Sequence, residues 1–209
     1  MHVGGVDFFA ACRSLVDQFR PLKAGQSDLS FPSSSLRQPP PEKRPFEELM
    51  TLYAARDDSN WPIARVYLVE QRKISTGLVD ELHACGSIYA NNHRPNPSLV
   101  FLHRDQHGEV CGATLRDTRH QSAFRPCLGN KLTAWFAVGD LAKAERVVAV
   151  ESPIDAPSYH SLFACPNDSL AVVSCAGAAI PQTLMFQAHY RCQAFVVALD
   201  NDFAANAAG

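Results

Sequence analysis

The chain has 209 residues, 46% of them hydrophobic, which is enough for one large domain or two small ones and excludes an intrinsically disordered chain. A formal net charge of −2 and a pI of about 6.4 exclude the overall basic excess typical of nonspecific nucleic-acid binding, so any such binding requires a local patch. With no apolar run of about 18 residues and no evident signal peptide, we expect a cytoplasmic protein without a membrane span.

The N-terminal part of the chain is predicted to be helical and then extended. Apolar spacing predicts an amphipathic helix over residues 6–20. Residues 24–45 collect prolines and a run of serines, a composition typical of a solvated linker. We therefore expect a helical segment over residues 1–23 and a linker over 24–45.

Three short helices are predicted next, over residues 46–56, 63–71 and 76–84. Ser75 is well placed as the N-cap of the third helix, and Gly86 as its C-terminal stop. Consecutive short helices are usually packing elements, and a helix–turn–helix that reads DNA is the alternative.

Residues 98–115 have the pattern of a β-hairpin. Apolar runs over 99–102 and 110–115 flank a turn over 105–108. His103, His107 and Cys111 are spaced four apart, which on a helix would form a metal-binding face. The strand character of the segment argues against zinc, and the seven scattered cysteines, without a C-x-x-C pair, indicate reduced thiols.

The segment over residues 116–131 is locally basic. It is interpreted either as a solvated loop or as a surface that contacts phosphates. Trp135 and Phe136 follow, and we predict that they belong to the core rather than to a base-stacking platform. The basic residues that would contact nucleic acid or phosphate are Arg116, Arg119, Arg125 and Lys131.

The last third of the chain alternates between strand and helix patterns. After a short helix over 140–145, the predicted elements are strands over 147–151, 170–175 and 195–200, with helices over 154–163 and 181–189 between them and a turn at Gly177. Such alternation predicts a parallel, doubly wound sheet with buried strands and right-handed crossovers.

Carboxylates follow two of these strands. Glu151 ends the first strand, Asp155 begins the following helix, and Asp200 and Asp202 end the last strand. The carboxyl ends of parallel strands meet at one edge of a sheet, which is where open α/β sheets bind ligands. Mg²⁺ takes oxygen ligands, so a few carboxylates with a substrate phosphate complete its shell. Acidic strand ends that merely cap helices are the alternative.

Three segments in this order, Glu151-Ser-Pro-Ile-Asp155-Ala, Ser174-Cys-Ala-Gly177 and Ala198-Leu-Asp200-Asn-Asp202, resemble the Toprim domain of bacterial primases, topoisomerases and some nucleases. Residues 67–74, 86–89, 100–101, Arg116 and 129–131 are similar to the domain that precedes Toprim in primase-like proteins of plasmids and integrative mobile elements.

The resemblance implies an α/β fold: a small primase-associated α+β domain over 46–145, then a Toprim-like, Rossmann-like parallel sheet with flanking helices over 146–209, incomplete at its C-terminus. It implies that Glu151 is the general acid/base or a metal ligand, that Asp155 assists it, and that Asp200 and Asp202 hold Mg²⁺ or Mn²⁺. Arg116 and Lys131 would contact phosphates.

The expected function is magnesium-dependent, primase-like nucleotidyl transfer in DNA replication. The implied partners are single-stranded DNA, nucleoside triphosphates and replication or helicase proteins, with no membrane. A Toprim nuclease uses the same carboxylate-held metal, so the sequence leaves strand cleavage open. The sequence is also compatible with a catalytically incomplete module that binds DNA or a partner, and with an ordinary α/β domain.

Overall fold

The computed structural model describes residues 44–93, 96–119, 126–165, 169–177, 180, 184 and 192–199. The chain divides into two compact units, 1–42 and 43–209, and the described residues belong to the second. The predicted helix over 6–20 lies outside the described residues, as do residues 24–43 of the predicted linker and, except for Leu184, the predicted helix over 181–189. The helices are α2 (Phe46–Tyr53), the 3-10 helix η1 (Asp58–Asn60), α3 (Trp61–Val66), the π-helix η2 (Tyr67–Gln71), α4 (Thr76–Ala84) and α5 (Asp155–Phe163).

The three predicted helices before the first sheet are present. α4 begins after Ser75 and ends before Gly86, whose φ of 72° lies in the left-handed region that glycine adopts without a steric penalty. The predicted helix over 63–71 is α-helical up to Val66 and continues as the π-helix η2. Among all the residues that the structure describes, no helix has the length and apolar character needed to cross a bilayer.

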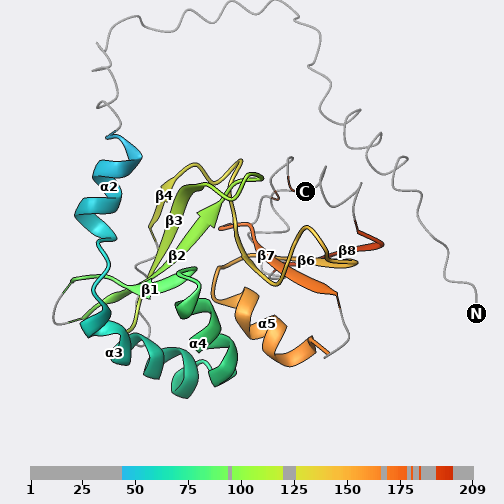
Figure 1. Ribbon diagram of the computed structural model, residues 1–209, viewed down its shortest axis with the longest axis horizontal. Helices are drawn as coiled ribbons and strands as arrows, with labels where there is room; N and C mark the ends of the chain where they lie inside the picture. The colour runs from blue at the N-terminus through green and yellow to red at the C-terminus, as the bar shows by residue number, and fades with distance from the viewer. Residues whose placement is uncertain are drawn as a thin grey trace, which may run out of the picture. The chain divides into compact units, whose positions relative to one another are not determined.

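The first sheet is antiparallel, with strand order β1-β2-β3-β4 (Figure 1). The predicted hairpin is confirmed: β2 and β3 pair, and the Asp105 carboxylate accepts the N–H groups of His107 and Glu109 in the turn between them. The short outer strands were not predicted. The strands are β1 (Ile88–Ala90), β2 (Ser98–Arg104), β3 (Val110–Asp117) and β4 (Cys127–Gly129).

The second sheet has strand order β5-β7-β6-β8, where β6 is parallel to β7 and β8, and β5 is antiparallel to β7. The predicted parallel strands are confirmed, whereas β5 was not predicted. The predicted helix over 140–145 is wrong, because residues 141–143 form a turn in which the Asp140 carboxylate accepts the Ala142 N–H. The strands are β5 (Phe136–Val138), β6 (Arg146–Val150), β7 (Leu170–Ser174) and β8 (Ala194–Ala198).

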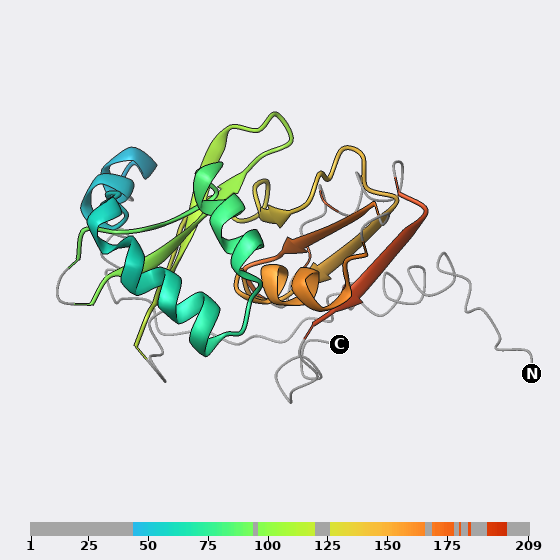
Figure 2. The ribbon, with the colours of Figure 1, turned by 60° about the horizontal axis from the view of Figure 1, so that its bottom comes forward.

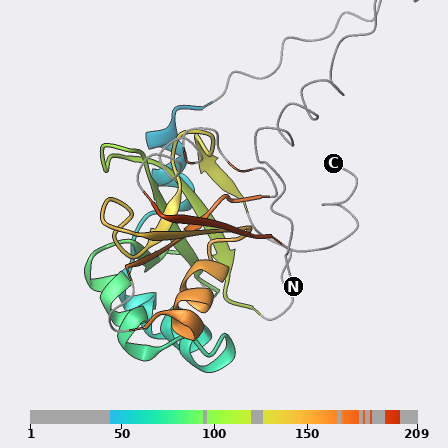
Figure 3. The same ribbon diagram turned by 90° about the vertical axis from the view of Figure 1, so that its right-hand side faces the viewer.

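β6 and β7 are buried on both faces, which explains their continuous apolar sequences. Val148 packs into the cluster on the α5 face, and Val147 packs into the cluster on the opposite face. α5 lies against the sheet on the first of these faces (Figure 3). The prediction that the last strand is buried is wrong: β8 is an edge strand among the described strands, and Val196 and Val197 are 39% and 52% exposed.

The two sheets lie side by side and share one hydrophobic core (Figure 2). Phe101 of β2 meets Phe136 of β5 edge to face, with ring centroids 5.2 Å apart. Arg104 and Trp135 exchange two backbone hydrogen bonds of 2.9 and 3.1 Å. Trp135 and Phe136 are thus core residues, as predicted, and the packing sets β3 beside the carboxyl end of β6.

Candidate active site

A pocket of about 150 Å³ lies where the carboxyl end of β6 faces the first sheet. Glu151, the residue after β6, lines this pocket together with Arg116 of β3. The pocket therefore brings together two predicted site residues from different sheets. The other described residues that line it are Phe101, Thr114, Leu115, Cys127, Ser152, Pro153, Ile154, Ala176 and Gly177.

The backbone of Glu151 is held by the turn that follows β7. The Gly177 N–H donates to the Glu151 carbonyl at 3.0 Å, and the Cys175 N–H donates to the Val150 carbonyl at 2.9 Å. The Ser174 hydroxyl is fully buried; its oxygen accepts the Ala176 N–H at 3.2 Å and lies 3.4 Å from the Glu151 carbonyl oxygen. These contacts extend the pairing of β6 and β7 past the ends of both strands.

Asp155 holds the other side of the same segment. Its carboxylate accepts the Ser152 N–H at 3.1 Å and the Ser152 hydroxyl at 2.7 Å. It stands in the first turn of α5, as the sequence predicted, but it is not among the residues that line the pocket. The hydrogen bonds of Asp155 fix the turn between Glu151 and α5. A direct role of Asp155 in catalysis stays a prediction.

The predicted basic residues fall into different environments. Arg116 is half-buried in the pocket wall, and the Lys131 ammonium lies 3.9 Å from the position that a Cβ on Gly177 would occupy. Within the described residues, neither side chain forms an ion pair. Arg119 is instead paired with the buried Asp117 carboxylate, which raises the pKa of the guanidinium. Arg125 lies outside the described residues.

The two remaining carboxylates, Asp200 and Asp202, also lie outside the described residues. β8 pairs with β6 in parallel register up to Val150 and Ala198, so Glu151 and Leu199 are the next residues at the same edge. The described residues alone contain no group of three His, Cys, Asp or Glu able to hold a metal. Glu151 supplies an oxygen donor of the type that Mg²⁺ prefers, and a complete cation site needs further oxygen ligands at this edge.

Two further lining residues were not predicted from the sequence. Burial raises the pKa of the Cys127 thiol, which opposes thiolate formation. The neighbouring Thr114 hydroxyl is bonded to His103 Nε2 at 2.9 Å. These residues belong to the first sheet, and nothing in the sequence indicates that β3 and β4 face Glu151; only the packing of the sheets brings them there.

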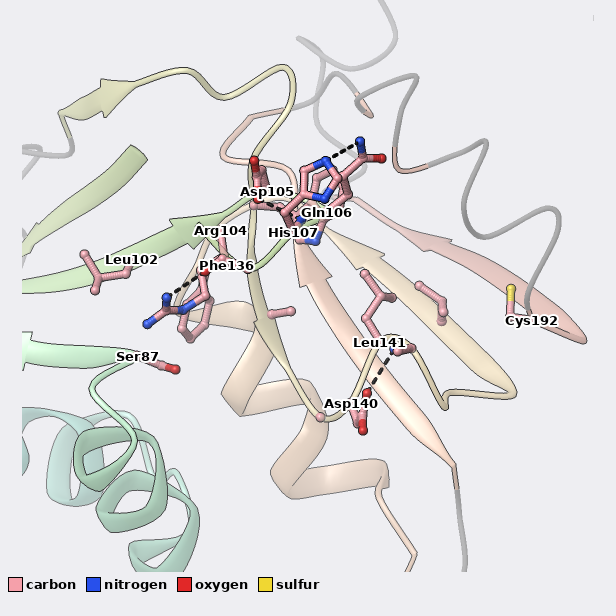
Figure 4. A pocket seen from close by; sticks show the side chains of 16 residues that line it. Ser87, Leu102, Arg104, Asp105, Gln106, His107, Phe136, Asp140, Leu141 and Cys192 are labelled. Atoms are coloured by element: carbon pink, nitrogen blue, oxygen red, sulfur yellow. Dashed lines mark hydrogen bonds between the residues drawn. The ribbon is translucent and has the colours of Figure 1, made fainter. Parts of the chain in front are cut away.

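A larger cavity of about 650 Å³ lies away from this pocket, at the turn of the β2–β3 hairpin (Figure 4). The turn residues Arg104 to Gly108 form one wall, and residues 139–142 form another. None of the predicted site residues that the structure describes lines it. Although it is the larger cavity, we take the smaller pocket as the candidate site, because it holds Glu151 and Arg116 together at a strand end.

Comparison with known proteins gives a family match over part of the chain and solved structures with a similar fold. A family described as a protein of unknown function (DUF3991) matches residues 66–144. No curated protein matches the chain.

Among solved structures, the DnaG catalytic core is 16% identical and gives a TM-score of 0.51, with 78% of this chain and 63% of that one covered. The DnaG primase catalytic domain bound to single-stranded DNA is also 16% identical, with a TM-score of 0.50 and coverage of 78% and 62%. The primase fragment of the bacteriophage T7 primase-helicase protein is 22% identical with a TM-score of 0.48, and 66% of this chain and 56% of that one are covered. The chain thus spans less than two thirds of each structure's length, and the two DnaG comparisons show that it has a primase-like α/β fold.

Proposed function

We propose that this chain carries a Toprim-type, metal-dependent centre for nucleotidyl transfer on nucleic acid, of the kind found in primases. One observation carries the proposal: Glu151, at the carboxyl end of a central parallel strand, shares a pocket with Arg116 from a second sheet. A carboxylate and a guanidinium in the lining of one pocket suit a cation–phosphate pair, since the carboxylate attracts the metal and the guanidinium attracts the phosphate.

The proposed metal ligands are Glu151, Asp200 and Asp202. Asp200 directly follows Leu199 in the sequence, and the β6–β8 register brings Leu199 to the edge where Glu151 lies. When bound, Mg²⁺ or Mn²⁺ would orient a triphosphate and an attacking hydroxyl and neutralise the developing charge. Besides binding the metal, Glu151 is proposed to act as the general acid/base that transfers the proton of the attacking hydroxyl.

Arg116 and Lys131 are proposed to bind phosphates. Arg116 lines the pocket, and the Lys131 ammonium lies 3.9 Å from where a Cβ on the pocket-lining Gly177 would stand. Neither forms an ion pair with a carboxylate in the described part of the chain. Arg119 has a weaker claim, because Asp117 already neutralises it. Arg125 stays a prediction from the basic segment.

The decisive experiment is a calorimetric titration of the chain with Mg²⁺ and Mn²⁺, with and without nucleoside triphosphate and single-stranded DNA. We expect binding that strengthens with nucleotide, and we expect the double variant Asp200→Asn with Asp202→Asn to lose it while keeping the fold, because amides replace the charged oxygens that hold the cation.

The matched control is Asp80→Asn with Asp140→Asn, which changes the net charge by the same amount at two exposed ion pairs. This control should bind metal like the original chain. A folded Asp200/Asp202 variant with unchanged metal affinity would defeat the assignment. DNA binding without any metal binding would favour the module that binds but does not catalyse.

The broader context of the proposal follows the sequence resemblance. We propose a replication role on a plasmid or integrative element, in the cytoplasm, with single-stranded DNA, nucleoside triphosphates and replication or helicase proteins as partners. We also propose the division into a primase-associated domain over 46–145 and a Toprim-like domain over 146–209. Strand cleavage by the same centre is distinguished by assaying primer synthesis and cleavage on one template.

A further inference from the structure

We propose that Ser174 is a positioning residue that fixes the backbone of Glu151 through the turn over residues 174–177. The expected effect of Ser174 on catalysis rests on the proposed function. Its effect on the Glu151 backbone does not depend on that function. Ser174 lines neither the small pocket nor the larger cavity, so its role would be to act through Glu151.

The turn has an unusual backbone that needs support. Ala176 has a φ of 50° and Gly177 a φ of 146°, both in the left-handed region, where an alanine carries a steric cost. The Ser174 oxygen accepts the Ala176 N–H within this turn. Because the oxygen is fully buried, water cannot replace it as the acceptor.

The turn over residues 174–177 also fixes the backbone of Glu151. Its Gly177 N–H reaches the Glu151 carbonyl at 3.0 Å, and the Ser174 hydroxyl lies 3.4 Å from the same oxygen, a long contact that adds little energy. The main effect of Ser174 is therefore assigned to its hydrogen bond with the Ala176 N–H, which fixes the turn. The turn then fixes Glu151 through the hydrogen bond from the Gly177 N–H. On the opposite side, Asp155 holds Ser152.

The Glu151 carbonyl and the neighbouring Ser152 are both anchored, which leaves the Glu151 backbone little freedom, so the position from which its side chain starts is set before a ligand binds. Groups that orient a metal ligand typically change metal affinity or activity by about 10- to 100-fold when they are removed, because the ligand then has to be ordered during binding. We expect an effect of that order from Ser174.

The test compares Ser174→Ala with Ser169→Ala. Ser169 is a matched control because it precedes the other end of β7 and its hydroxyl also forms a hydrogen bond with the backbone, donating to the Lys143 carbonyl at 2.8 Å. Ser174→Thr keeps a hydroxyl and should therefore behave like the original chain in both readouts below. Gly177→Ala is a second variant, since the backbone conformation of Gly177 disfavours any side chain, while an added Cβ would meet only the Lys131 Nζ, at an ordinary contact distance of 3.9 Å.

The first readout needs no activity. In Ser174→Ala, we expect the amides of Ala176 and Gly177 to exchange hydrogen at least about 10-fold faster and the backbone chemical shifts of Glu151 and Ser152 to change. Ser169→Ala should leave all four residues unchanged. If Ser174→Ala leaves the exchange and the shifts as in the original chain, Ser174 does not position Glu151, whatever the chain binds.

The second readout is Mn²⁺ affinity and the rate of nucleotidyl transfer. We expect Ser174→Ala and Gly177→Ala to weaken Mn²⁺ binding or lower kcat by about 10- to 100-fold, with the KM for nucleotide little changed. A disturbed turn with unchanged affinity and kcat would overturn the proposal. If the original chain binds no Mn²⁺, the proposed function fails, and the exchange readout still decides whether Ser174 positions Glu151.

Discussion

His103 is a fully buried imidazole in the middle of the first sheet. Its Nε2 is bonded to the Thr114 hydroxyl, and its Nδ1 has no hydrogen-bond partner among the described residues. Its cross-strand neighbour is Gly112, where a Cβ would lie 3.3 Å from the His103 Cβ. Burial lowers the pKa of His103 to about 4, so the imidazole is neutral at pH 7.

The buried imidazole predicts a loss of stability in mild acid. The pKa is about 4 in the folded state and 6.5 in the unfolded state, so the unfolded chain binds more protons between these values. The stabilisation is fully present above pH 6.5 and is lost as the pH falls toward 4. We expect this group to lower the free energy of unfolding by on the order of 3 kcal/mol across that window, as measured by urea denaturation.

The comparison that isolates His103 uses His103→Gln and His107→Gln. The first variant should lose this part of the pH dependence. The second replaces an exposed histidine in the hairpin turn and should keep it. Identical pH profiles for His103→Gln and the original chain would contradict the prediction.

At the scale of elements, the strands that are buried on both faces were predictable, and the shortest strands were not. β6 and β7 show continuous apolar runs because each face packs against a core cluster. β1, β4 and β5 have three residues each, too few for a periodic pattern to distinguish strand from loop.

The wrong predictions have local causes. The segment after Asp140 has apolar spacing like a helix, but the Asp140 side chain bonds the Ala142 N–H and closes a turn in its place. β8 has an apolar sequence like that of β6, and its exposure follows from its place at the sheet edge, which depends on the order of strands. Similarly, Glu151 could be chosen as a strand end, whereas its place in one pocket with Arg116 depends on the packing of two sheets.

The contrast between β6 and β8 can be measured at one position of their ladder, because Val148 pairs directly with Val196. Val148 is 0% exposed and Val196 is 39% exposed. We expect Val148→Ala to lower the free energy of unfolding by about 2 to 3 kcal/mol, since it removes buried methyl groups and leaves a cavity. Val196→Ala should cost less than about 1 kcal/mol. Equal losses in urea denaturation would show that β8 is covered as fully as β6.

At the scale of the whole molecule, the net charge of −2 gives little general attraction to nucleic acid. Binding to single-stranded DNA should therefore depend on a few cations near the pocket. We expect Arg116→Ala and Lys131→Ala each to reduce the slope of log K against log salt by about 0.7, the value for one phosphate contact on a single strand.

Fluorescence anisotropy at several salt concentrations measures that slope. Arg65→Ala is the control, because this arginine is exposed on α3 and paired with Asp80. It should leave the slope unchanged. If neither Arg116→Ala nor Lys131→Ala changes the slope, the strand does not contact these residues.

The core shared by the two sheets has a mechanical consequence for the pocket. Phe101 of the first sheet and Phe136, Val148 and Val172 of the second belong to one buried cluster. A hinge motion that separated the sheets would expose this cluster to water at a cost of about 25 cal/mol for each Å². The span between Arg116 and Glu151 is therefore fixed by packing, and any gating of the pocket must come from side chains and loops at its rim rather than from opening between the sheets.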